Sequence, residues 1–241
     1  MAGSRSTIMW YPLNKMNEIF EFPAPKLKAL LADVVTPALP GFTHNGAYLW
    51  YSSWENRCRK VVRVYPLKGA DYIFQWGLCF DFLPVFGESG SCRYERTDKS
   101  VGLHLFCWPP GHWGFTIRKS VPCRFSRFGR DFGDVESQLL QAFHEAQGLF
   151  TPWFQNCCGL HGALAEARRQ CDDPVSQYNW PGPDYVTAFL LAVNGDVKTG
   201  MKVLDEFWTR RGGDFPPALY EKLQKKLLAC ANGGDNINDR K

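Results

Sequence analysis

The chain has 241 residues, of which 45% are hydrophobic and 22% charged, and a formal net charge of +4. A disordered chain would have fewer apolar residues and a stronger charge imbalance, and a small disulfide-rich domain would be shorter and denser in cysteine. The composition therefore indicates one large globular domain or two small ones, with a full apolar core.

Two sequence features indicate a cytoplasmic protein. No apolar run approaches the ~20 residues of a membrane-spanning helix, and residues 1–9 lack the apolar stretch of a secretory signal. The nine cysteines are odd in number and irregularly spaced. In a reducing compartment such residues behave as small buried apolar side chains, so we expect free thiols rather than a disulfide framework.

The two parts of the chain differ in charge and in aromatic content. Residues 1–130 contain 17 Lys and Arg against 9 Asp and Glu, a balance of +8, whereas residues 131–241 have a balance of −4. The first part also holds 23 of the 36 aromatic residues. Aromatic residues favour strands, and the Ala, Leu, Glu and Lys of the second part favour helices. We expect a sheet region over 1–130 and a helical region over 131–241, packed as one compact unit.

The first region begins with a predicted helix over residues 26–35, which has apolar residues at helical spacing and ends at Thr36-Pro37. The clearest strand is 72–82, in which Tyr72, Phe74, Trp76 and further apolar residues alternate with a second face. The strands are expected at 47–54, 61–65, 72–82 and 101–108, with a short edge strand at 115–118.

The second region changes to a helical period. Asp134 is the expected N-cap of a helix that reaches Phe150, and Asn194-Gly195-Asp196 is the expected turn between two later helices. Further helices are predicted over residues 160–170, 184–193, 197–210 and 216–230.

These elements predict an α+β protein. Its antiparallel sheet has four to five strands within residues 41–118, with a leading helix and a C-terminal helical segment. We expect the 26–35 and 134–150 helices to cover the aromatic face of the sheet.

The sequence contains weak candidates for a metal or catalytic site. The run Cys157-Cys158-Gly159-Leu160-His161, with Cys171 beyond it, offers one doublet, one His and one distant Cys, whereas zinc sites use two ligand pairs at short spacing. We interpret it as a buried cysteine pair at a helix junction, and we expect no metal and no cofactor. An enzyme would have to assemble an unrecognised site among His104, His112, His144 and His161.

One segment is typical of a binding surface. Residues 118–130 contain five basic residues, no acid and two interleaved phenylalanines. Arginines beside aromatic rings form anchors at protein interfaces, hold phosphate backbones, or pair with acids of their own chain. The candidate partner-binding residues are Arg118, Lys119, Arg124, Phe125, Arg127, Phe128 and Arg130.

The first ~110 residues resemble an uncharacterised bacterial family, domain of unknown function number four-three-zero-four. The resemblance is carried by a leading helix that runs into Gly41-Phe42, by the strand at 48–51, by the run 61–65 and by the run 73–78. Members of that family are similar to immunity proteins of toxin systems. The resemblance implies a small cytosolic α+β protein with a binding role, and it assigns no catalytic residues.

The resulting hypothesis is a non-enzymatic protein-binding module, of the type of a bacterial immunity protein that occludes its cognate toxin. The alternative is a nucleic-acid-associated factor, resembling a phage-defence component, that uses residues 118–130. The net charge of +4 is a point against immunity to a nuclease, because such proteins tend to be acidic.

Overall fold

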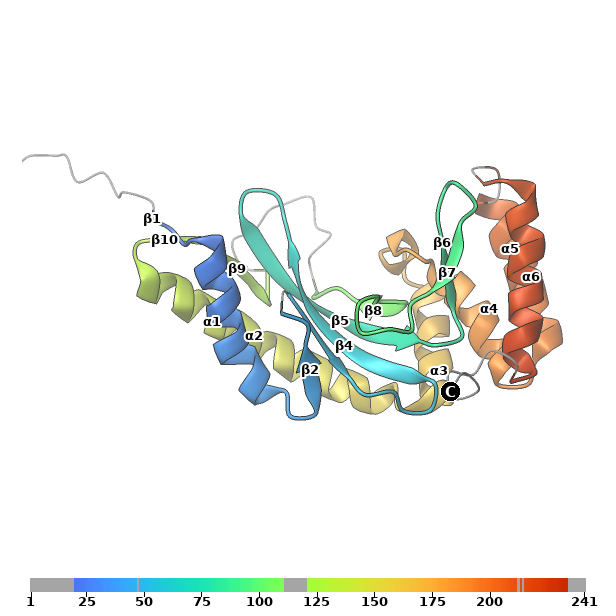
Figure 1. Cartoon of the computed structure of the whole chain (residues 1–241), viewed down its shortest axis with the longest axis horizontal. Coiled ribbons are helices and arrows are strands. Elements are labelled where there is room, and N and C mark those ends of the chain that lie inside the picture. Colours follow the sequence, from blue (N-terminus) through green and yellow to red (C-terminus); the bar gives the residue numbers. More distant parts are fainter. Residues whose placement is uncertain (1–19, 47, 111–120, 212, 214, 234–241) are drawn as a thin grey trace, which may run out of the picture.

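The computed structural model describes residues 20–46, 48–110, 121–211, 213 and 215–233. It shows an α+β protein in which an antiparallel sheet lies between two groups of helices (Figure 1). The helices are α1 (Ala24–Ala38), α2 (Phe132–Asn156), α3 (Gly159–Cys171), α4 (Pro183–Val193), α5 (Val197–Arg211) and α6 (Pro217–Ala231), with a 3-10 turn, η1, at Ser176–Tyr178.

The main sheet has six strands in the order β2-β3-β4-β5-β8, with β9 also paired to β5. Its strands are β2 (Phe42–His44), β3 (Leu49–Ser52), β4 (Cys58–Pro66), β5 (Asp71–Phe80), β8 (Leu105–Cys107) and β9 (Arg124–Ser126). Two smaller antiparallel pairs join β1 (Phe20–Glu21) to β10 (Phe128–Gly129) and β6 (Pro84–Phe86) to β7 (Cys92–Tyr94).

Strand β5 organises the sheet. One edge pairs with β4 over nine positions, from Cys58 opposite Phe80 to Pro66 opposite Tyr72. The other edge is divided, because β9 pairs with residues 71–73 and β8 with residues 76–78. The two short strands therefore complete one edge of one long strand.

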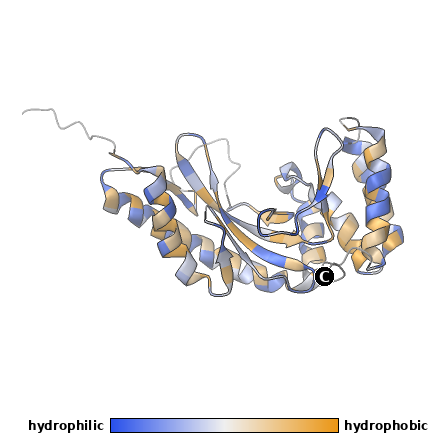
Figure 2. Cartoon of the chain, viewed as in Figure 1, coloured by the Kyte–Doolittle hydropathy of each residue, from blue (hydrophilic) through white to orange (hydrophobic). Residues whose placement is uncertain are grey.

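The aromatic face of β5 is buried beneath helices, which confirms the alternation expected for this strand. Phe74 lies 5.5 Å from Phe143 of α2 between ring centres, and Trp76 lies 6.2 Å from Phe150. The inner face of α1 is fully buried in the same apolar cluster, which continues through the buried residues of α4, α5 and α6. Figure 2 shows apolar residues on the sides of these elements that face the interior.

The other face of the sheet carries a smaller apolar cluster. Tyr51, Val61, Cys79 and Phe106 come from the strands, and Leu103 comes from the segment that joins β7 to β8. Arg59 holds this segment, because its Nη2 donates to the carbonyl oxygen of Thr97 at 3.0 Å.

Several predicted boundaries were wrong. Helix α1 runs through Thr36-Pro37 to Ala38, because a proline in a final turn removes only one intrahelical hydrogen bond. The predicted strand 101–108 shrinks to β8, since residues 101–104 do not join the ladder with β5. Between the predicted strands 47–54 and 61–65 the chain makes a tight turn at Asn56-Arg57, and β4 already begins at Cys58. The edge strand predicted at 115–118 lies outside the described residues.

The N-cap of α2 is Asp131 rather than Asp134. The Oδ1 atom of Asp131 accepts a hydrogen bond from the backbone N–H of Asp134 at 2.8 Å. Asp134 lies in the first turn instead and accepts from the N–H of Arg130 at 2.9 Å. Both carboxylates suit the positive end of the helix dipole, so the sequence pattern alone could not separate them.

The C-terminal helices agree with the predicted ranges to within one residue at each end. Gly195 has a φ of +95° in the turn between α4 and α5, a conformation that favours glycine. The sheet, in contrast, extends beyond the predicted residues 41–118. Strand β9 of the main sheet lies outside that range, and the separate β1–β10 and β6–β7 pairs were not predicted.

Candidate functional site

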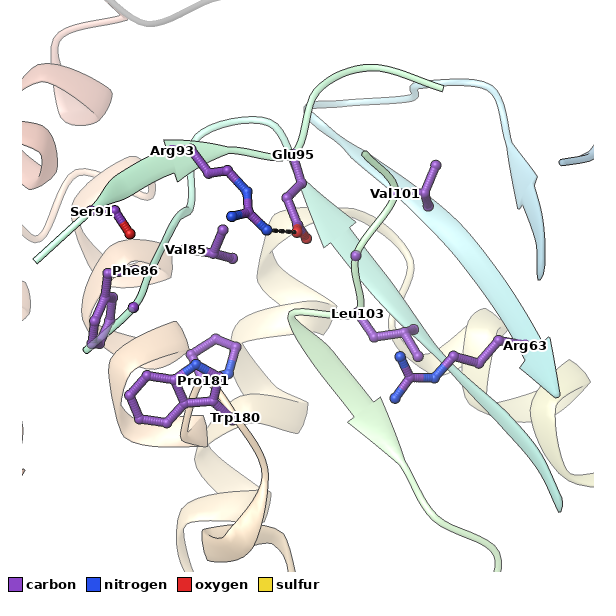
Figure 3. A pocket seen from close by; sticks show the side chains of 12 residues that line it. Arg63, Val85, Phe86, Ser91, Arg93, Glu95, Val101, Leu103, Trp180 and Pro181 are labelled. Atoms are coloured by element: carbon purple, nitrogen blue, oxygen red, sulfur yellow. Dashed lines mark ion pairs between the residues drawn. The ribbon is translucent and has the colours of Figure 1, made fainter. Parts of the chain in front are cut away.

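A pocket of about 330 Å³ lies at the sheet face that the helices do not cover. Its walls come from β4, the β6–β7 hairpin, the segment after β7 and the loop before α4. Figure 3 shows Arg63 reaching in from one side, Arg93 and Glu95 forming an ion pair on another, and Trp180 with Pro181 on a third. The volume is at the lower end of the ~300–1,000 Å³ of small-ligand sites.

Arg63 projects from β4 on the side away from the helices. Its Nε donates a hydrogen bond to Oε1 of Gln75 at 2.5 Å, and its guanidinium lies over the rings of Tyr65 and Phe106. Among the described residues, nothing accepts a hydrogen bond from its two terminal nitrogens, and no carboxylate lies within ion-pair distance. Arg63 is therefore a well-fixed cation with unused donors.

The surroundings of Arg63 act on its pKa in opposite directions. Burial lowers the pKa of the guanidinium, and this is the largest effect, while Tyr65 and Glu95 raise it. The cation has thus lost part of its hydration without gaining an anionic partner, which is an unfavourable state for a buried charge.

Glu95 is held by two basic side chains. Its carboxylate lies 3.6 Å from Nη2 of Arg93 and 3.4 Å from Nε2 of His104. Burial alone would raise the pKa of Glu95, but the neighbouring imidazole of His104, and then the charge and hydrogen bond of Arg93, outweigh it and hold the pKa below its usual range. Glu95 is therefore an anion at neutral pH.

The pocket wall also contains a close approach that only glycine allows. A Cβ atom added to Gly102 would lie 1.5 Å from Oε2 of Glu95. A larger residue at position 102 would therefore displace the carboxylate of Glu95.

A rigid loop forms the far wall. Asn179 is buried, accepts a hydrogen bond from Nε1 of Trp108 at 3.1 Å and donates to the carbonyl oxygen of Phe106 at 3.2 Å. At its start, the carboxylate of Asp173 accepts from the hydroxyl of Ser176 at 2.6 Å, which lowers the pKa of Asp173. The loop is thus tied both to β8 and to the end of α3.

This loop presents Trp180. The indole is 44% exposed, meets Phe86 edge to face at 5.0 Å and stacks on Phe215 at 5.8 Å between ring centres. Tyr178, two residues earlier, is also exposed. A large ring that is fixed in place yet open to solvent is typical of an anchor at a protein interface.

The described histidines and cysteines are poorly suited to catalysis. His104 is buried, and its Nδ1 accepts a hydrogen bond from the N–H of Phe80 at 2.9 Å while its Nε2 faces Glu95, so neither nitrogen is free to act as a base. His144 and His161 are exposed on helices, and His112 lies outside the described residues.

All nine cysteines carry free thiols, and burial is the main cause of raised pKa values at several of them. It raises the pKa to about 11 at Cys58 and Cys79 and to about 12 at Cys123 and Cys157. Such thiols are inert at neutral pH, because the thiolate is the nucleophile. In the described part of the chain, no group of three or more His, Cys, Asp or Glu could hold a metal ion, and this includes the Cys157–His161 run with Cys171.

The described residues of the predicted basic and aromatic segment differ in burial, and their arginines form ion pairs within the chain. Arg118 and Lys119 lie outside the described residues. The ring of Phe125 is buried, in β9, whereas that of Phe128 is partly exposed in β10. Each of the three described arginines pairs with an acid of the same chain: Arg124 with Asp71, Arg127 with Glu21 and Arg130 with Asp134.

The pocket was not predicted, because Arg63, Glu95 and Trp180 are far apart in the sequence and each lies in a different local pattern. One feature of the sequence did point to this face of the sheet. Arg63 interrupts the β-branched run 61–65, and an arginine inside an apolar strand indicates a face that is not packed like the core.

Comparison of the chain with protein-family models, with curated proteins and with solved structures gives no match. Among the described helices, none is both long and apolar enough to cross a membrane.

Proposed function

We propose that this chain is a non-enzymatic, cytoplasmic protein-binding module that acts as an immunity protein does, by covering the active surface of a toxin. The observation that carries the proposal is a hydrogen-bonded loop that presents Trp180 in the same pocket as Arg63 and Arg93. Trp and Arg are the residue types most enriched at the energetic centres of protein interfaces. A loop held in place before binding loses little conformational entropy on association.

The charges of the site indicate the kind of partner. The pocket is lined by two arginines and one glutamate, which leaves a balance of one positive charge. An acidic surface on the toxin would complement this side of the molecule.

The binding role is favoured over an enzymatic one by the state of the reactive side chains. Nδ1 of the buried His104 accepts a hydrogen bond from the backbone and its Nε2 faces Glu95, and burial raises the pKa of thiols such as those of Cys58 and Cys79. A preformed surface that occludes a partner needs neither a base nor a nucleophile.

The test is complex formation with the product of the gene directly upstream, measured by titration calorimetry with purified proteins. We expect Trp180→Ala to weaken binding by at least about 2 kcal/mol, as for a central interface anchor. Phe128→Ala is the matched control, because Phe128 is a similarly exposed ring in the predicted basic segment. Weakening by Phe128→Ala alone would place the interface at residues 118–130, and the absence of any complex would reject the proposal.

A salt titration separates the nucleic-acid alternative. Affinity for DNA or RNA falls steeply with salt, with a log–log slope set by the number of phosphate contacts. The ion pairs of Arg124, Arg127 and Arg130 within the chain reduce the charge available for such contacts. We therefore expect no nucleic-acid binding at physiological ionic strength.

A further inference from the structure

The pocket contains an incomplete hydrogen-bonding arrangement at Arg63. Gln75 is fully buried and gives its oxygen to Nε of Arg63, while its own Nε2 has no hydrogen-bond partner in the described part of the chain. The amide therefore cannot satisfy the rest of the guanidinium. The two terminal nitrogens of Arg63 remain available on the pocket side, where Figure 3 shows them pointing into the space below Leu103.

The charges around the pocket leave one positive charge without a counterion. Arg93 lies beside Glu95, and its side chain is 73% exposed to water. Arg63 has no such partner and is partly buried. A ligand with a single negative charge would neutralise Arg63, whereas a phosphate dianion would bring a second charge close to Glu95.

The shape of the Arg63 guanidinium and the residues of the pocket walls further restrict the chemical class of the ligand. A guanidinium presents its donors as a planar fork, which matches the two oxygens of a carboxylate. The opposite wall is formed by Trp180, Pro181 and Phe86, and it suits the methylene groups that carry such a carboxylate. A pocket of about 330 Å³ has room for a side chain or a small acid.

We propose that the pocket is a carboxylate-binding site, in which Arg63 binds an acidic side chain of the partner protein and Trp180 contacts the stem of that side chain. The proposal rests on the proposed function only for the source of the carboxylate. The affinity of Arg63 for a carboxylate is a property of this chain and can be measured without the partner.

The experiment uses the full chain and a matched pair of probes. N-acetyl-glutamic acid α-amide carries one side-chain carboxylate, and N-acetyl-glutamine α-amide is its neutral counterpart. Binding is followed by NMR through the Nε–H signals of Arg63 and Trp180. We expect saturable shifts with the acid, with a dissociation constant of about 1 mM, and none with the amide.

Variants assign the effect to the pocket. Arg63→Gln removes the charge and should weaken binding about tenfold or more. Arg63→Lys keeps the charge without the planar fork and should bind at an intermediate level. Arg130→Gln removes an exposed arginine outside the pocket and should bind as the original chain does.

A variant at another position keeps the test valid if the Arg63 variants do not fold correctly. Ser91 lines the pocket from an exposed position on the β6–β7 hairpin, so Ser91→Phe fills the space without changing Arg63. We expect it to abolish the shifts. Equal binding of the acid and the amide, unchanged binding in Ser91→Phe, or no saturable shift at millimolar acid would each overturn the proposal.

The outcomes also separate the two proposals. Probe binding at Arg63 without a complex with the upstream gene product would leave the carboxylate site and reject the proposed function. A complex whose affinity is unchanged by Arg63→Gln, together with no probe binding, would leave the function and reject the site.

Discussion

Arg57 and Asp81 form a buried ion pair that joins the sheet to the last helix. The Nε of Arg57 lies 3.0 Å from Oδ1 of Asp81, and its Nη1 donates to the carbonyl oxygen of Cys230 in α6 at 3.2 Å. The carboxylate of Asp81 is only 4% exposed. One guanidinium thus links the turn before β4, the end of β5 and the C-terminal end of the helical region.

Removal of Arg57 should therefore destabilise the contact between the sheet and the C-terminal helix α6. We expect Arg57→Met to lower the free energy of unfolding by about 2 kcal/mol or more, because it removes the cation 3.0 Å from the buried carboxylate of Asp81 and the hydrogen bond to Cys230. Urea unfolding measures the change, and hydrogen exchange in α6 should accelerate. Arg130→Gln, at an exposed pair, is the control and should change stability by less than about 0.5 kcal/mol. Equal effects of the two substitutions would contradict this role.

The low pKa of Glu95 predicts a specific acid sensitivity. Since the folded protein binds the proton of Glu95 less tightly than the unfolded chain does, this group stabilises the fold fully above its unfolded value of 4.5. The contribution is lost as the pH falls through the lower folded value. We expect Glu95→Gln to reduce the loss of stability between about pH 5 and pH 3, as measured by urea unfolding at a series of pH values. Glu136→Gln, on the exposed side of α2, should leave the loss as steep as before.

Glu166 of α3 links this helix to α2 and should be sensitive to truncation. Its carboxylate accepts hydrogen bonds from Nε1 of Trp153 at 3.0 Å and from Nε2 of Gln170 at 2.9 Å, and it pairs with Arg169 at 2.7 Å. We expect Glu166→Ala to destabilise the fold by about 2–4 kcal/mol in urea unfolding, because it leaves partly buried donors without an acceptor. Glu206→Ala on α5 should cost less than about 1 kcal/mol. A smaller loss at Glu166 than at Glu206 would refute this role.

Substitution by alanine should change the stability of the fold in opposite directions at two glycines. A Cβ at Gly77 of β5 would lie 2.3 Å from the carbonyl oxygen of Leu105, so Gly77→Ala should force β8 away and cost about 3 kcal/mol or more. Gly148 is exposed in the middle of α2 with nothing within 4 Å of an added Cβ, and Gly148→Ala should stabilise the fold by about 1 kcal/mol. Thermal unfolding distinguishes the two, and a shared sign would contradict the close packing of β5 on β8.

Much of the fold could be predicted because some segments carry strong local patterns. The alternation from Tyr72 onward predicted a strand with one buried aromatic face, and the Asn194–Asp196 turn separated two helices at the correct residues. Such signals come from neighbours in the sequence, so no knowledge of the rest of the chain is needed.

Elements without a local pattern were missed for a physical reason. Residues 124–126 contain Arg, Phe and Ser, and they form β9 only because β5 offers a free edge and the core accepts Phe125. The β6–β7 hairpin likewise has only three residues in each strand. The candidate pocket depends on such long-range placement throughout, which explains why it could not be predicted.

The divided edge of β5 has a consequence for the order in which the protein assembles. Strands β3, β4 and β5 follow one another closely along the chain and can associate as soon as they are synthesised. The opposite edge of β5 must wait for two separate later segments, and until both arrive it exposes unpaired backbone groups to neighbouring molecules. During translation, this edge is where a nascent chain would be most vulnerable to aggregation.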